Sequence, residues 1–443
     1  MNELPELRTA AREIFDEALA AVDARRAVLD AVEFDGARLR VGDSHFEPRD
    51  NTSKVYSVAL GKAAAAMASA LDERLGGALA GGVLSAPPSD FTLSERWRVY
   101  AGGHPLPNAE SLEAARAAFE LLREADEAEA PVVFLVSGGG SAMLELPRDG
   151  RITLEDLREA NRLLVACGAP IEEVNAVRRA LSAVKGGGLS AHAPRSAQAT
   201  LVVSDVALGR AHDVASGPTL AAPPDAPDVA ETVARYGLAP KLPASVLRTL
   251  EEEGTHGAAR TAPVAKRTFS VLLDNANACE AAVRAAHLRG FAVEYARDVV
   301  EQHVEEGAAE LISRLLTLRA GVRGVCLVSG GEFSCPVRGG GTGGRNSETA
   351  LRVAFELERR SADDFPKHVV ALCAGTDGID GNSPAAGALA DETTIGRAHA
   401  RGLGAREALE ESDAYTLFEQ LGDAVITGPT GTNVRDLRIL LAV

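Results

Sequence analysis

VVFLVSGGGSAM, residues 132–143, and GVCLVSGGEFSC, residues 324–335, are two short apolar runs that each stop at Ser-Gly-Gly. A continuous apolar run of this length is typical of a strand that is buried on both faces of a parallel sheet. Open α/β sheets bind ligands at glycine-rich turns beyond the carboxyl ends of such strands. The repeated phrase therefore predicts two α/β domains, each with a glycine loop that faces a shared cleft.

The size and charge of the chain agree with two domains and small ligands. The chain has 443 residues, of which 46% are hydrophobic, whereas a single domain seldom exceeds roughly 250–300 residues. Its net charge of -17 repels polyanions. We therefore expect small-molecule substrates and neither a nucleic-acid nor a membrane partner, and the sequence is compatible with a homodimer.

Cysteine usage predicts a cytoplasmic protein. The five cysteines are odd in number and form no C-x-x-C pair, which is typical of reduced, buried thiols. The acid-rich amphipathic segment 1–22 lacks the features of a signal peptide, and no stretch has the roughly 18 apolar residues of a membrane span.

Strands and helices alternate along the chain, which predicts two three-layer α/β/α domains: a Rossmann-like, mostly parallel sheet and then a mixed sheet. In the first half we expect strands at 55–60, 82–86, 97–101, 132–137 and 199–204, and helices at 62–74, 108–125, 153–166 and 173–184. In the second half we expect strands at 268–273, 291–296, 324–329, 369–374 and 424–427, and helices at 276–289, 302–319, 345–359 and 405–421.

A Pro-rich and then charged segment, 218–265, reads as a connector with short helices. We therefore expect an N-terminal domain over 1–240 and a C-terminal domain over 241–443. The closing LRILLAV is a further strand that could return to either domain.

Lysine is rare, with six in the chain, so a lysine beside glycine indicates a role that needs a compact ammonium. Lys62 and Lys185 meet this description. Lys62 joins a predicted strand to a predicted helix, where its amine could neutralise a transferring phosphoryl group. A solvated lysine at a helix start is the alternative reading.

The loop Ser137-Gly138-Gly139-Gly140-Ser141 can turn bare backbone amides toward an anion, because glycine permits a close approach. A plain turn is the alternative. The second Ser-Gly-Gly loop continues as Gly330-Gly331-Glu332. Its acidic residue favours a contact with a ribose or a metal ion.

Residues 339–346, GGGTGGRN, formally match G-x-G-x-x-G but do not directly follow a predicted strand. As a dinucleotide fingerprint the match is weak. With Gly343, Arg345 and Asn346 at the start of a predicted helix, the segment instead favours a phosphate or carboxylate clamp.

Acids follow predicted strands in both halves. Asp205 closes TLVVSD, and Asp377 and Asp380 follow VVALCAG. A carboxylate at this edge of a sheet can hold magnesium or orient a hydroxyl, so we expect Asp205 to be a metal ligand or to orient the substrate hydroxyl; capping a turn is the alternative.

The loop 427–437, TGPTGTNVRDL, offers Thr430, Thr432 and Asn433 for phosphate or sugar oxygens. His104 and His212 have no nucleophile partner in the sequence and are interpreted as structural or substrate-side polar groups.

Together these segments resemble the glycerate 2-kinase family, glycerate kinases with a C-terminal MOFRL domain. The motifs ALGKAA, LVSGGGSA, NAVRRALSAVKGGGL, VVSDVALGRAHDVASGPT, GGRNSE, AGTDGIDGNSPAAGA and TGPTGTNVRDL stand in the order in which that family carries such motifs. The resemblance runs from about residue 10 to the end.

This resemblance implies an ATP-dependent kinase that converts D-glycerate to 2-phosphoglycerate, with the site in the cleft between two α/β domains. The family's central lysine and arginine match Lys62 and Arg345. The hypothesis is in-line transfer of the γ-phosphoryl with ATP and Mg²⁺, helped by charge neutralisation. Arg178, Arg179 and Arg210 are alternative partners for the substrate carboxylate, if Arg345 holds phosphate. An NAD(P)H-dependent hydroxypyruvate reductase and a non-catalytic nucleotide or sugar-acid sensor are the alternatives.

Overall fold

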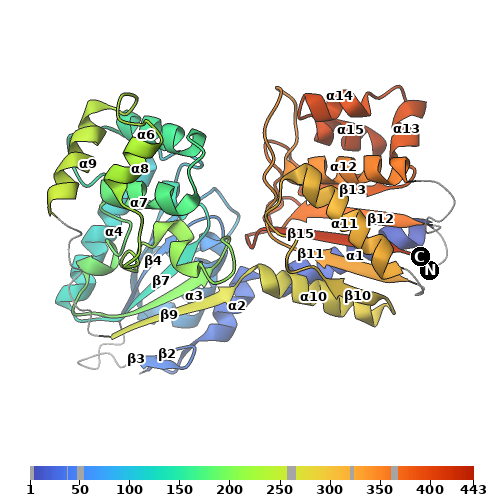
Figure 1. Ribbon diagram of the computed structural model, residues 1–443. Coiled ribbons are helices and arrows are strands. Elements are labelled where there is room, and N and C mark those ends of the chain that lie inside the picture. The colour runs from blue at the N-terminus through green and yellow to red at the C-terminus, as the bar shows by residue number, and fades with distance from the viewer. Residues whose placement is uncertain (1–3, 37, 47–53, 257–265, 320–323, 361–367) are drawn as a thin grey trace. The chain divides into compact units, whose positions relative to one another are not determined.

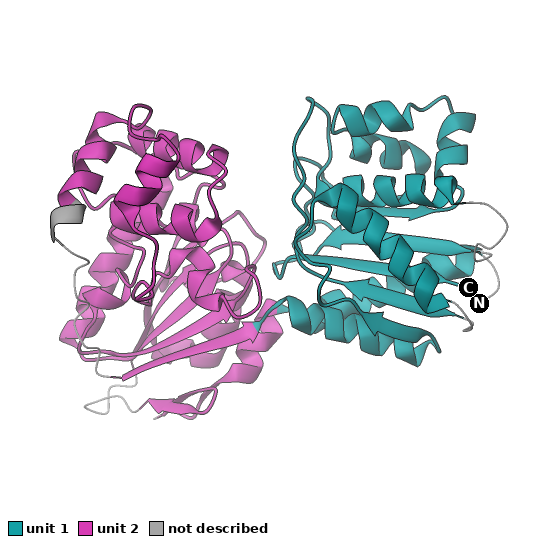
Figure 2. Ribbon diagram, viewed as in Figure 1, with its two compact units in different colours: residues 1–23, 273–443 teal, residues 24–272 magenta. Residues whose placement is uncertain are grey.

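The computed structural model describes residues 4–36, 38–46, 54–256, 266–319, 324–360 and 368–443. The chain divides into two compact units: residues 1–23 with 273–443 form unit 1, and residues 24–272 form unit 2 (Figure 2). Each unit is built on a six-stranded sheet (Figure 1). The predicted α/β fold class is confirmed, with one mostly parallel and one mixed sheet. In the described ranges, no helix is long and apolar enough to span a bilayer.

Unit 2 has the strand order β6-β5-β4-β7-β8-β9, and the first five strands are parallel neighbours. Its elements are α2 (Ala24–Ala31), β1 (Val32–Phe34), β2 (Leu39–Val41), β3 (Ser44–Phe46), β4 (Val55–Leu60), α3 (Ala64–Leu75), η2 (Gly76–Ala78), β5 (Leu79–Ala86), β6 (Trp97–Ala101), α4 (Ala109–Glu127), β7 (Val132–Ser137), α5 (Gly140–Met143), α6 (Leu154–Ala166), α7 (Ile171–Leu181), η3 (Ser190–His192), β8 (Ala197–Val203), η4 (Ala211–Ser216), α8 (Val229–Arg235), α9 (Ala244–His256) and β9 (Lys266–Leu273).

The central strands of this sheet are apolar because both of their faces are covered. All six residues of β4 are buried. Tyr56, Val58 and Leu60 share a core cluster with α4, and α3 packs on β4, β5 and β7. Strands covered on both sides read as unbroken apolar runs, so the sequence locates them well.

The segment expected to be a connector folds with unit 2. Val233 of α8 and Val246 and Leu250 of α9 lie in one apolar cluster with residues of α6 and α7. The last part of the expected connector, 257–265, lies outside the described residues. The expected boundary at 240/241 therefore falls inside unit 2, and β9, expected in the second domain, is the edge strand beside β8.

Unit 1 has the strand order β10-β11-β15-β12-β13-β14. Strand β15 pairs antiparallel with both β11 and β12, so the closing strand belongs to the second sheet. The elements of unit 1 are α1 (Leu4–Ala21), α10 (Asn275–Leu288), β10 (Ala292–Tyr295), α11 (Val304–Arg319), β11 (Val325–Ser329), α12 (Arg345–Arg359), β12 (Val369–Gly375), β13 (Gly387–Asp391), α13 (Thr394–Ala400), α14 (Ala405–Glu410), α15 (Ala414–Leu421), β14 (Ala424–Val425) and β15 (Asp436–Ala442).

Alternate residues of β15 face two different cores. Leu437, Ile439 and Leu441 cluster with residues of α1 and α10, whereas Leu440 and Ala442 cluster with residues of α11 and α12. Helix α1 thus completes unit 1, although the chain begins with it. The helix expected at 405–421 is divided into α14 and α15, with Ser412 between them in a left-handed conformation at φ 54°.

Candidate functional site

Three of the predicted site segments meet at one edge of the unit 2 sheet. Strands β4, β7 and β8 are parallel neighbours, so their carboxyl ends lie side by side. Lys62 follows β4, the loop Ser137–Ser141 follows β7, and Asp205 follows β8. The fold therefore gathers an ammonium, a glycine loop and a carboxylate, as ligand sites of open α/β sheets require.

The turn that carries Lys62 packs directly on the glycine loop. The amide of Lys62 donates to the carbonyl of Gly138 at 2.8 Å, and the amide of Ala63 donates to Oγ of Ser137 at 3.0 Å. Gly61 has φ 112°, and a Cβ atom there would lie 2.4 Å from the Ser137 carbonyl oxygen. Only glycine allows this approach, so the position of Lys62 is set by the loop itself.

Asp205 and His104 lie against the same loop. A Cβ atom at Gly138 would lie 1.7 Å from Oδ2 of Asp205. A Cβ atom at Gly139, which has φ 80°, would lie 3.1 Å from Cδ2 of His104 and 3.3 Å from Cγ of Lys62. The three side chains thus converge on two glycines.

The loop amides are available for an anion. In the described part of the chain, the backbone amides of Gly138, Gly139, Gly140 and Ser141 donate to no residue beyond the turn of α5 itself. Consecutive free amides of this kind form an anion-binding concavity.

A buried polar network supports the far side of the loop. Oγ of Ser141 lies 2.7 Å from Oγ of Ser216, which donates to Oδ1 of Asn175 at 3.0 Å. Ala215 and Ser216 both have left-handed backbones, with φ of 52° and 60°. Such strain persists where the surrounding structure enforces it and is concentrated at functional sites. Sequence reasoning missed Asn175 because its partner lies 41 residues away.

The three candidate arginines differ in how their charge is compensated. Arg179 donates to Asp213 at 2.5 Å, and Arg210 pairs with Asp213 at 2.6 Å and with Glu172. Arg178 donates through Nε to the neutral amide of Asn161 at 3.1 Å. Burial lowers the pKa of Arg178, and the charge of Glu145 opposes this shift only in part. Among the described residues, Arg178 forms no ion pair within bonding distance.

Lys185 is not presented to a ligand. Its side chain is buried and forms an ion pair with Glu145, and the Glu145 carboxylate also accepts from Oγ of Ser182. Burial lowers the pKa of the Lys185 ammonium, which Glu145 counteracts. The described structure thus pairs Lys185 with Glu145, and the phosphate contact of Lys185 stays a prediction.

In unit 1, Arg345 is the first residue of α12 and is held by Asp436. Its Nε and Nη2 donate to the Asp436 carboxylate at 2.6 and 3.1 Å, and its Nη1 pairs with the half-exposed Glu332. Burial alone would lower the pKa of Arg345, but the charges of Asp436 and Glu332 raise it above the ordinary value. The guanidinium therefore stays charged.

The amides at the start of α12 are already occupied. Asp380 accepts from the backbone amides of Asn346 and Ser347 at 2.9 and 2.8 Å and from Oγ of Ser347 at 2.6 Å. A carboxylate at a helix N-terminus satisfies these donors and the helix dipole. Asp380 thus has the capping role. The Asn346 side chain donates to Asp436 at 3.0 Å, while its buried Oδ1 has no hydrogen-bond partner.

The second Ser-Gly-Gly loop is fixed from behind. The amide of Gly331 donates to Oδ1 of Asn275 at 2.8 Å, and a Cβ atom at Gly330 would lie 1.9 Å from the same oxygen. Glu332 pairs with Arg345 and, at 3.6 Å, with Arg435. This loop is therefore less open to an anion than the loop in unit 2.

The remaining predicted contacts hold turns together. Thr430 donates through Oγ1 to the carbonyl of Thr376 at 2.6 Å. The carboxylate of Asp377 accepts from the amide of Ile379 at 3.1 Å, and the Asn433 side chain accepts from the amide of Arg435 at 3.2 Å. Oγ1 of Thr432 is buried without a hydrogen-bond partner. Ligand contacts of Asp377, Thr430 and Asn433 stay predictions.

A hollow of about 540 Å³ opens beside Arg345. It is lined by Glu332, Phe333, Gly343 and Asn382, among others. Asn382 accepts from the amide of Gly343 at 2.8 Å, which orders the glycine segment on this wall. Its volume is in the range of small-molecule sites.

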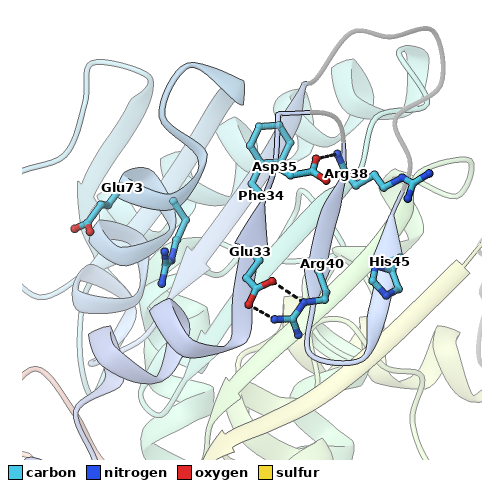
Figure 3. Close-up of a pocket in the computed structure, with 8 residues that line it drawn as sticks. Glu33, Phe34, Asp35, Arg38, Arg40, His45 and Glu73 are labelled. Atoms are coloured by element: carbon cyan, nitrogen blue, oxygen red, sulfur yellow. Dashed lines mark hydrogen bonds and ion pairs between the residues drawn. The ribbon is translucent and has the colours of Figure 1, made fainter.

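A second hollow lies at the three-stranded sheet β1–β3 and contains none of the predicted site residues (Figure 3). Figure 3 shows Glu33 facing Arg40, with Nε of Arg40 3.0 Å from the carboxylate. The backbone amide of Arg38 donates to Asp35 at 2.7 Å. These charges compensate one another within the hollow.

The acids do not form a preassembled metal centre. In the described ranges, no group of three or more His, Cys, Asp or Glu side chains is arranged to hold a metal ion.

Comparison with known proteins identifies the family. Residues 10–251 match a domain of unknown function, DUF4147, and residues 325–436 match the MOFRL family. A glycerate 2-kinase from Pyrococcus horikoshii is 34% identical over 98% of this chain and 97% of its own. The chain belongs to the glycerate 2-kinase family.

Two further relatives of this glycerate 2-kinase family member bear on fold and reaction. The crystal structure of a glycerate kinase from Thermotoga maritima has a TM-score of 0.79 at 31% identity, covering 99% of this chain and 100% of that chain. A protein from Agrobacterium vitis with the provisional name hydroxypyruvate reductase is 34% identical over 98% of this chain and 94% of its own.

Proposed function

We propose that this protein transfers the γ-phosphoryl group of ATP to the C2 hydroxyl of D-glycerate, giving 2-phosphoglycerate and ADP. Family membership supports the reaction, since a glycerate 2-kinase matches over nearly the whole of both chains. The observation that carries the mechanism is the convergence of Lys62 and Asp205 on the glycines that follow β7.

Phosphoryl transfer asks a protein chiefly for positioning and for neutralisation of charge. The free amides of Gly138–Ser141 bind oxygens of the polyphosphate, and the Lys62 ammonium balances negative charge as the phosphoryl group moves. We assign Arg345 to the same reaction as a second cation, because Asp436 holds its guanidinium so that, among the described residues, Nη1 pairs only with the half-exposed Glu332.

Asp205 is the residue we assign to Mg²⁺ or to orienting the C2 hydroxyl. A carboxylate beside an anion-binding loop is a donor of the type that Mg²⁺ prefers. Mg²⁺ bound there would supply further neutralisation of phosphate charge.

We assign the glycerate carboxylate to Arg178. A carboxylate substrate needs an arginine whose charge no resident acid has already neutralised. Arg179 and Arg210 are both bound by Asp213, whereas Arg178 is held through Nε by a neutral amide, leaving its two Nη atoms for the ligand. Asn175, one turn earlier on α7, connects this helix to Ser216 and so to the glycine loop.

The reductase is the second candidate, because a relative carries that name. Its sequence signal, the G-x-G-x-x-G of 339–344, leads into α12, whose first amides are occupied by Asp380. A dinucleotide fingerprint requires these amides for the pyrophosphate, so the kinase is favoured.

The deciding experiment incubates the purified protein with ATP, Mg²⁺ and D-glycerate and measures ADP. The kinase predicts ADP that depends on glycerate, and no change in NADH or NADPH absorbance with hydroxypyruvate. NAD(P)H oxidation without ADP formation would establish the reductase. Binding of ATP and glycerate without turnover by either reaction would establish a sensor.

The five cysteines are free thiols, which supports the further proposal of a cytoplasmic location.

A further inference from the structure

A fully buried arginine occupies a core position in β15. Arg438 alternates with Leu437 and Ile439, so it faces the side of the sheet that also receives Leu440 and Ala442. Its guanidinium carbon lies 3.5 Å from the centre of the Phe333 ring, and its side chain is fully buried. An apolar residue would be expected here.

Arg438 connects two segments of the site in unit 1. Its Nη1 donates to the carbonyl of Gly330 and lies 3.3 Å from Oγ of Ser329. Its Nη2 lies 3.7 Å from Oδ2 of Asp436, the residue that holds Arg345. A continuous series Arg438, Asp436, Arg345 therefore leads from the core to a half-exposed guanidinium.

Burial of this series of charged side chains costs folding stability. Burial lowers the pKa of Arg438 despite the nearby charge of Asp436, and its Nε and Nη2 donate to no hydrogen-bond acceptor. Buried ionic triads can often be replaced by apolar residues without loss of stability. Stability alone therefore does not account for an arginine at this position.

The geometry indicates what the series does to Arg345. Asp436 accepts hydrogen bonds from Nε and Nη2 of Arg345. These two bonds fix the plane of the guanidinium and leave Nη1 as its outward edge. Nη1 pairs with Glu332, whose side chain is 39% exposed, so this pair can exchange with another anion.

We propose that Asp436 and Arg438 are positioning residues for the reaction: Asp436 aims Nη1 of Arg345 at the anionic substrate, and Arg438 fixes both Asp436 and the Ser329–Gly331 turn. This inference rests on the proposed function only for the identity of the anion. The rotational order of Arg345 is a property of the protein itself.

The test compares Arg438→Met and Asp436→Asn with Arg397→Met in the full chain. Arg397 is the matched control, because it pairs with Asp391 and Asp423 in the same unit but lies outside the series. We expect kcat of folded Arg438→Met to fall on the order of 10²-fold, the effect of misplacing one reacting group, with KM nearly unchanged. Its melting temperature should also fall, because one partner of a buried ion pair is removed. We expect Arg397→Met to have a lower melting temperature than the wild type and an unchanged kcat per folded molecule.

A second readout does not need turnover. The Nε–H signal of Arg345 in the ¹H–¹⁵N spectrum should exchange slowly with water in the wild type and rapidly in Asp436→Asn and Arg438→Met. If Arg438→Met behaves like Arg397→Met in kcat, or if the Arg345 signal is equally protected in all variants, the proposal is overturned. If Arg438→Met does not fold, kcat and the exchange of the Arg345 signal are measured in Asp436→Asn instead, and the same outcomes apply. A wild type that is inactive yet shows the expected Arg345 protection would refute the proposed reaction and leave the positioning role standing.

Discussion

A Cβ atom at Gly138 would lie 1.7 Å from the Asp205 carboxylate. No side chain can be added at Gly138 while Asp205 keeps its place, although Gly138 has no left-handed backbone that would require glycine. The position of the Asp205 carboxylate thus requires glycine at position 138, and a side chain at position 138 would displace Asp205.

Gly138→Ala should therefore displace Asp205 and reduce kcat on the order of 10²-fold, with an unchanged circular dichroism spectrum. Asp205→Ala should have a similar effect, and the double variant should be no worse than either single one, because the two changes remove the same interaction. Gly77→Ala is the control, since its Cβ would meet open space. Losses in kcat that simply add would show that Gly138 and Asp205 act independently.

Lys62→Met should reduce kcat by a factor on the order of 10²–10³, the range for removing one stabilising group of a transition state, and leave the melting temperature close to that of the wild type. Lys62→Arg should restore little, because a guanidinium is not a compact ammonium. Steady-state ADP formation measures both, with exposed Lys54→Met as control. Wild-type kcat in Lys62→Met would remove the lysine from the mechanism.

Arg178→Lys should raise KM for glycerate on the order of 10–100-fold, because a charged hydrogen bond contributes about 1.5–3 kcal/mol. KM for ATP should change little. Arg162→Lys on α6, which exchanges one surface cation for another, is the matched control. An equal rise in both KM values would show that Arg178 shapes the site without binding the carboxylate.

Asp213 should make the free energy of unfolding depend on pH. Burial would raise its pKa, but hydrogen bonds from Arg210 and Arg179 hold it below the ordinary value. A lowered pKa contributes stability that is complete above the unfolded-state pKa, about 3.9, and is lost as pH falls through the folded-state pKa. Asp213→Asn should therefore lose about 3 kcal/mol of unfolding free energy at pH 7, as for a broken buried pair.

Urea unfolding at pH 7, 5 and 3.5 measures this difference, with exposed Asp225→Asn as control. The difference between the wild type and Asp213→Asn should be the same at pH 7 and 5 and should shrink at pH 3.5. A difference that grows on acidification would contradict the assigned shift.

The elements that the sequence predicts well are those whose pattern is local. Strands such as 132–137 and helices such as 345–359 have the predicted bounds, because an apolar run or a stripe of period 3.6 depends on neighbours in the chain. The membership of α1 in unit 1 and of β9 in the first sheet could not be predicted, because an apolar face does not specify which other face it meets.

The same distinction holds for the site. Lys62, the Gly138 loop and Asp205 come together because they follow strands, and strand ends meet at one edge. The roles of Lys185 and Asp380 depend on Glu145 and on the α12 amides, which are distant in sequence. Asp436 and Arg438 did carry a signal, since two charges in the apolar strand DLRILLA are unexpected.

The position of the phosphoryl group on the product tests the central claim most directly. The product of ATP and D-glycerate is passed to enolase, which consumes 2-phosphoglycerate, and phosphoenolpyruvate is measured with and without added phosphoglycerate mutase. Transfer to the C2 hydroxyl predicts phosphoenolpyruvate at once, in proportion to the ADP formed, without the mutase. Phosphoenolpyruvate that forms only after the mutase is added would show transfer to C3 and contradict the account.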